Sequence, residues 1–183
     1  CKTWDGVVLY GRGVGTVLEA YKLHKASADQ SYAELTGYWV TSDVYDTLAP
    51  GVAAAERCST IVLSTSKNKI YYITTHWTST PVGDITELNA VGKVFTDYKP
   101  KISSTKSLSG HSLGATSEHE EVYSLIMMKN NFISASVNIT DRDKEEKKYT
   151  IVTKGEKEME QNYVMTNSLE FGGKEETRVF EKR

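Results

Sequence analysis

The sequence predicts a layered α/β domain with a mixed β-sheet. Two observations favour this fold class: short apolar runs of strand length alternate with longer segments whose apolar residues recur at helical spacing, and turn-forming or charged residues separate most of them. The chain has 183 residues, of which 39% are hydrophobic and 25% charged, as is usual for a globular protein. We therefore expect residues 1–183 to form a single domain.

The N-terminal elements follow from composition and period. Residues 7–10 form an apolar run closed by glycines, residues 14–24 indicate a strand that turns into an amphipathic helix, and residues 32–41 indicate another strand. Residues 52–63 carry Ala, Glu and Arg at helical spacing, and Pro50 stands where a helix can start.

The remaining elements continue the alternation. Residues 70–73 are typical of a buried strand, and residues 84–95 place Ile85, Leu88, Val91 and Phe95 at helical intervals. Another helix is expected over residues 113–128, after a glycine-flanked loop. Strands at residues 149–153, 163–168 and 177–180 complete the chain.

Charge and cysteine usage narrow the function classes. The 22 basic and 24 acidic residues are mixed along most of the chain, so we expect neither nucleic acid nor an anionic membrane as a partner. Only Cys1 and Cys58 are present, which favours a reduced, cytoplasmic location. No apolar stretch approaches the roughly 20 residues that cross a bilayer. The start, Cys-Lys-Thr-Trp-Asp, is expected to lie inside a longer parent protein.

Two loops carry the residues with the most chemistry. His76 lies in the segment THWTSTPVGD of residues 75–84, and Lys106 and His111 lie in STKSLSGHSLGA of residues 104–115. Histidine and lysine side chains in loops otherwise built of small residues mark a candidate active site.

Other motifs support weaker hypotheses. Gly11, Gly13 and Gly15 lack the G-x-G-x-x-G spacing of a dinucleotide fingerprint, so a tight turn is expected there. The segment GHSLG matches the nucleophile elbow of serine hydrolases, with Ser112 as the nucleophile, but no histidine follows at the usual place in the chain order. No metal is expected, because His76, His111, Glu87 and Glu120 lack metal-ligand spacing. We expect His24 and His119 on the surface.

The two loops, together with YSLIMMKNNFISASVNI and the terminal NSLEFGG, resemble the C-terminal half of the β-ketoacyl-acyl carrier protein synthases, condensing enzymes of the thiolase fold. The resemblance runs from end to end. It implies a layered α/β/α half of a thiolase-like fold with a mixed five-stranded sheet.

The resemblance also implies a reaction and a set of site residues. It implies a decarboxylative Claisen condensation in fatty-acid chain elongation, without a cofactor, on malonyl and acyl thioesters of acyl carrier protein. His76 and His111 match the histidines that stabilise an enolate oxygen, and Lys106 matches the lysine of the active site. Thr78 and Thr80 match threonines that bind the pantetheine arm, and Glu120 matches a buried supporting acid.

The family's nucleophilic cysteine belongs to an N-terminal half that this sequence lacks, and neither Cys1 nor Cys58 has a suitable context. The chain is therefore expected to be inactive alone in the full condensation, and the missing half is a candidate partner. Trp77 replaces a glycine and is expected to fill substrate space.

The alternative is an inert stand-alone scaffold, diverged or engineered. Under this hypothesis Glu118, Glu121, Lys174 and Glu175 would make an exposed face of the half soluble.

Overall fold

A computed structural model describes residues 8–9, 11, 13–27, 31–42, 52–65, 68–170 and 173–183. The helices are α1 Tyr21–Ser27, α2 Val52–Thr65, α3 Gly83–Val94, α4 Lys106–Ser109 and α5 Thr116–Asn130, with 3-10 turns at Leu113–Ala115 and Glu146–Lys148. The strands are β1 Ala33–Ser42, β2 Tyr72–Thr74, β3 Lys101–Ser103, β4 Phe132–Ile133, β5 Thr150–Ile151, β6 Glu156–Lys157, β7 Tyr163–Glu170 and β8 Lys174–Lys182.

The main sheet is mixed, as predicted, and has six strands in the order β1-β8-β7-β2-β3-β5. Strand β8 is antiparallel to both of its neighbours, whereas β7, β2, β3 and β5 pair in parallel. The five strands that the resemblance implied are one fewer than the sheet has. Periodicity did not predict β3, because three residues are too few to show a strand pattern.

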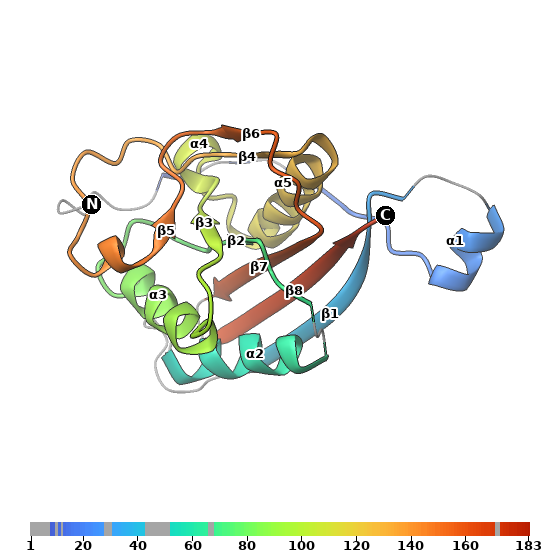
Figure 1. The fold of residues 1–183 in the computed structure, drawn as a ribbon, viewed down its shortest axis with the longest axis horizontal. Helices are drawn as coiled ribbons and strands as arrows, with labels where there is room; N and C mark the ends of the chain where they lie inside the picture. The colour runs from blue at the N-terminus through green and yellow to red at the C-terminus, as the bar shows by residue number, and fades with distance from the viewer. Residues whose placement is uncertain are drawn as a thin grey trace.

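The predicted layers are confirmed by the alternation of side chains along the strands. Ile73, Met165 and Val179 belong to the core on which α2 and α3 pack, and their chain neighbours Tyr72, Val164 and Phe180 belong to the core beneath α5. Figure 1 shows α2 and α3 on one face of the sheet and α5 on the other. The described residues form an α/β/α sandwich with its two larger apolar cores on opposite faces of the sheet.

The N-terminal segment departs from its prediction. Of the strand expected at residues 7–10, Val8 and Leu9 are described, and Leu9 forms only an isolated parallel bridge to His111. Residues 13–20 have no regular structure, and α1 begins at Tyr21. Cys1 and Pro50 lie outside the described residues.

Four charged residues were expected to lie on an exposed face and make it soluble, and this prediction is wrong for two of them. Glu121 and Glu175 are each 2% exposed, whereas Lys174 is exposed and Glu118 is half-buried. Glu121 forms an ion pair with Arg178 of β8, which also lies 3.6 Å from a carboxylate oxygen of Glu118. Arg178 therefore compensates the charge of the two acids that α5 turns toward β8.

No helix in the described part of the chain is long and apolar enough to cross a membrane.

Candidate active site

The topology brings the two predicted loops together. Strands β2 and β3 are parallel neighbours, so the chains that follow their carboxyl ends leave the sheet at the same edge. The Thr75 N–H donates to the Ser103 carbonyl at 3.0 Å, and the Ser104 hydroxyl donates to the Trp77 carbonyl at 3.2 Å. These bonds tie the loop that carries His76 to the loop that carries Lys106 and His111.

His76 and His111 converge. Their ring centroids lie 5.2 Å apart and the rings are nearly perpendicular, at 84°. The backbone N–H of His76 donates to both carboxylate oxygens of Glu87, at 3.0 and 3.2 Å, and the backbone N–H of His111 donates to the Val8 carbonyl at 2.7 Å. Both histidines are therefore held through the main chain as well as by packing.

Lys106 and Glu120 form an ion pair beside the histidines. Lys106 is 9% exposed and Glu120 2% exposed. Burial raises the pKa of Glu120, and the Lys106 ammonium offsets part of that rise. A buried charge pair of this kind is costly to separate, because the remaining charge would have no compensation.

Burial and charge keep both imidazoles neutral. Burial lowers the pKa of His76 well below its usual value, and Lys106 and His111 lower it further. The pKa of His111 is lowered first by burial and then by Lys106. The Leu113 N–H donates to His111 Nδ1 at 3.2 Å, so this nitrogen accepts and the proton of the neutral ring resides on Nε2.

Thr78 and Thr80 lie on the loop after His76, and their hydroxyl oxygens are 3.3 Å apart. Asp84 shapes this loop from the first turn of α3. Its Oδ1 accepts the N–H groups of Thr78 and Thr80, at 3.1 and 3.4 Å, while Ser79 between them takes a left-handed φ of 61°. Burial raises the pKa of Asp84 to about 6.

Sequence reasoning missed the roles of Asp84 and Glu87. Both lie on the first turns of α3, one helical turn apart, and each accepts backbone N–H groups of the His76 loop. Two acids at i and i+3 among apolar helix residues were the available signal. The sequence suggested Glu87 only as a metal ligand without the right spacing, and the described residues contain no cluster that could hold a metal ion.

Trp77 follows His76 and is half-buried. Its indole packs against the apolar core shared by the sheet, α2 and α3. That Trp77 fills substrate space stays a prediction.

Cys58, the one cysteine among the described residues, is not a reactive thiol. It is fully buried on α2, and its Sγ donates to the Trp39 carbonyl at 3.2 Å. Burial raises the pKa of this thiol, which opposes formation of a thiolate.

The Ser112 geometry argues against a serine hydrolase. His119 was expected on the surface but is 8% exposed, because α5 turns it toward the loop. Its Nδ1 lies 2.8 Å from Ser112 Oγ and also 2.8 Å from the Ala115 carbonyl. A carbonyl only accepts, so Nδ1 carries a proton and cannot take one from the serine.

Comparison with known proteins agrees with this architecture. Residues 32–140 match the family described as "Beta-ketoacyl synthase, C-terminal domain". Over 178 residues the chain is 44% identical to the 3-oxoacyl-(acyl-carrier-protein) synthase 1 of Haemophilus influenzae and 42% identical to that of Escherichia coli K12, covering 97% of this chain and 44% of each relative.

Solved structures show the same fold. A β-ketoacyl synthase from Burkholderia phymatum aligns with a TM-score of 0.85 at 30% identity, over 90% of this chain and 41% of that one. A type II polyketide ketosynthase solved with its acyl-carrier protein gives a TM-score of 0.83 at 25% identity, over 90% of this chain and 42% of that one. The chain therefore belongs to the β-ketoacyl synthase C-terminal domain family, and it spans less than half the length of its curated relatives.

Proposed function

We propose that this chain carries the decarboxylation half of a ketoacyl synthase active site, with His76 and His111 as the catalytic pair. The observation that carries the proposal is the convergence of two neutral imidazoles, 5.2 Å apart, beside the buried Lys106–Glu120 pair. Neutral imidazole N–H groups held in place beside a buried ion pair suit a developing oxyanion.

The proposed step is the loss of carbon dioxide from a malonyl thioester. The bond between the α-carbon and the carboxylate breaks, carbon dioxide leaves, and the electron pair moves into an enolate whose oxygen accepts the histidine N–H groups. Lys106 would orient its neighbours and Glu120 would hold Lys106. Thr78 and Thr80, whose hydroxyls are neighbours in the loop after His76, would bind the pantetheine arm.

The full condensation needs a nucleophile other than Cys58, because this thiol is buried and its pKa is raised. Large apolar side chains next to His111 are exposed: Val8 by 74%, Leu9 by 64% and Leu113 by 54%. Apolar side chains exposed beside the site favour a partner that covers them, and we propose that this partner is the half of the fold that bears the nucleophilic cysteine. Acyl carrier protein is the proposed carrier of the substrate, as in the ketosynthase complex that shares this fold.

The test is release of carbon dioxide from malonyl-acyl carrier protein by the purified chain. This half-reaction needs the histidines but no cysteine. We expect His76→Ala and His111→Ala each to reduce the rate about 100-fold or more, as loss of one oxyanion donor does elsewhere. His24→Ala, on α1, is the matched control and should leave the rate unchanged.

The outcome separates the two hypotheses for the chain. Release that disappears in a His76→Ala, His111→Ala double variant would support the proposal. A folded chain that releases no carbon dioxide would instead support an inert scaffold that retains the family's motifs.

A further inference from the structure

His111 lies at one end of a chain of hydrogen bonds that the sequence did not predict. Its Nδ1 is 2.7 Å from Thr116 Oγ1, which is 3.2 Å from Ser112 Oγ, which in turn is 2.8 Å from His119 Nδ1. Thr116 is 3% exposed and His119 8% exposed. Thr116 and His119 are buried and His111 and Ser112 half-buried, so water competes less for these hydrogen bonds than it would at an open surface.

The groups at the two ends of this hydrogen-bond chain determine which group donates in each bond. His119 Nδ1 also faces the Ala115 carbonyl, which only accepts, so this nitrogen carries a proton. At the other end the Leu113 N–H, which only donates, is directed at His111 Nδ1, so that nitrogen carries none. The two hydroxyls between them must then donate toward His111: Ser112 to Thr116, and Thr116 to the imidazole.

We propose that Thr116 is a positioning residue whose hydroxyl, supported by Ser112 and His119, holds His111 in the neutral tautomer with its proton on Nε2. The inference rests on the proposed function, because that N–H is the group that would stabilise the enolate oxygen. The hydrogen-bond chain itself belongs to the resting protein and can be measured without substrate.

Of the charged groups near His111, Lys106 acts in the same direction, because its ammonium disfavours a second positive charge. His76 faces it from the loop after β2, and Lys106 faces it from α4 with Glu120 of α5 as the partner of its charge. Glu87 of α3 binds the backbone of His76. A proton on Nδ1 would break the hydrogen bond from Leu113 and force the Thr116 hydroxyl to reverse. The hydrogen-bond chain therefore lowers the pKa of His111, as burial and Lys106 do.

Long-range 1H–15N NMR of the 15N-labelled chain tests the inference directly. We expect His111 to show an unprotonated Nδ1 and a protonated Nε2 near neutral pH. Thr116→Val keeps the shape of the side chain and removes the hydroxyl. It should raise the pKa of His111 by about half a unit to one unit, the worth of one hydrogen bond.

Two matched variants make the test specific. Thr116→Ser restores the hydroxyl and should titrate as the unmodified chain does. Ser124→Ala deletes another buried hydroxyl of α5, bonded to Thr74 at 2.7 Å, and should leave His111 unchanged. If Thr116→Val does not fold, Ser112→Ala removes the donor to Thr116 and should raise the pKa of His111 by a smaller amount.

A protonated Nδ1 in the unmodified chain would overturn the inference, and so would a folded Thr116→Val variant that titrates normally. The result is independent of carbon dioxide release. If the chain releases no carbon dioxide but Thr116→Val raises the pKa of His111 as expected, the inference stands and the proposed function is rejected. If the chain releases carbon dioxide but the pKa of His111 does not change in the variant, the proposed function stands and the inference is rejected.

Discussion

Glu87 illustrates how a single buried carboxyl supports the site. It is 1% exposed, burial raises its pKa to about 8, and the His76 N–H that it accepts offsets only part of that rise. In the unfolded chain the same group would titrate near its usual pKa of about 4.3. Between these values the folded protein binds the proton and the unfolded chain does not, so the free energy of unfolding falls as pH rises.

The two histidines change the free energy of unfolding with pH in the opposite direction. Their pKa values are lowered in the fold, so the unfolded chain binds more protons below about pH 6.5 and stability falls as pH drops there. Asp84, with its pKa raised to about 6, adds to the slope of Glu87 between about pH 4 and 6.

We therefore predict that Glu87→Gln flattens the loss of stability between about pH 6.5 and 8. The amide oxygen can still accept the His76 N–H, but the group no longer ionises. The free energy of unfolding from urea titrations at several pH values measures the effect, which is at most about 1.4 kcal/mol per pH unit for one proton. An unchanged slope in the variant would contradict the raised pKa of Glu87.

At the scale of elements, Gly37 sets how closely α2 approaches the sheet. It lies where the β1–β8 register shifts, and a Cβ there would stand 2.7 Å from Val62 Cγ1 of α2 and 3.3 Å from Val179 Cβ of β8. Glycine thus permits the close contact between helix and strand on which this face of the core depends.

We predict that Gly37→Ala lowers the free energy of unfolding by about 1–3 kcal/mol, because the methyl group overpacks this contact. Gly114→Ala is the matched control. A Cβ at Gly114 meets no atom within 4 Å, so that change should stay within about 0.5 kcal/mol. Urea denaturation of the unmodified chain and the two variants measures these changes. Equal unfolding midpoints for Gly37→Ala and the unmodified chain would contradict the prediction, because they would show that α2 can move away from the sheet at little cost in stability.

At the scale of the whole molecule, the N-terminal segment exposes unusual apolar area. Val17 is 95% exposed and Leu18 70%, and Figure 1 shows this part of the chain running outside the sandwich toward α1. Apolar side chains left in water favour association with another surface. That residues 1–183 form a single domain stays a prediction.

We predict that the chain self-associates as its concentration rises and that a Val17→Lys, Leu18→Lys double variant does so less. Sedimentation velocity over a range of concentrations measures this. Ala20→Lys adds charge to the same segment without removing a large apolar side chain, so it should behave as the unmodified chain. An unmodified chain that stays monomeric at every concentration would contradict the prediction.

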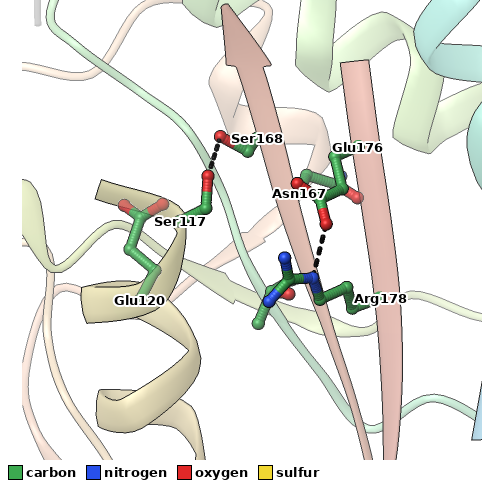
Figure 2. A pocket seen from close by; sticks show the side chains of 7 residues that line it. Ser117, Glu120, Asn167, Ser168, Glu176 and Arg178 are labelled. Atoms are coloured by element: carbon green, nitrogen blue, oxygen red, sulfur yellow. Dashed lines mark hydrogen bonds and ion pairs between the residues drawn. The ribbon is translucent and has the colours of Figure 1, made fainter. Parts of the chain in front are cut away.

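Buried polar contacts are the part of the molecule that sequence patterns describe least well. A small cavity of about 10 Å³ shows this, since it lies between α5 and strands β7 and β8 and its lining includes Ser117, Glu120 and Arg178. In Figure 2 the Ser117 hydroxyl meets that of Ser168, a bond of 2.8 Å, and Arg178 reaches Glu176 on the same strand. None of these partners follows from periodicity.

The sequence alone determined the alternation of strands and helices, the layered fold class and the loops that bear His76, Lys106 and His111, because periodicity and local composition are written along the chain. Only the tertiary structure decided that the two histidines meet, that Glu121 and Glu175 are buried, and that Thr116 reaches His111. Each of these depends on which residues distant in sequence become neighbours, and that is set by strand pairing and by the packing of α5 on the sheet.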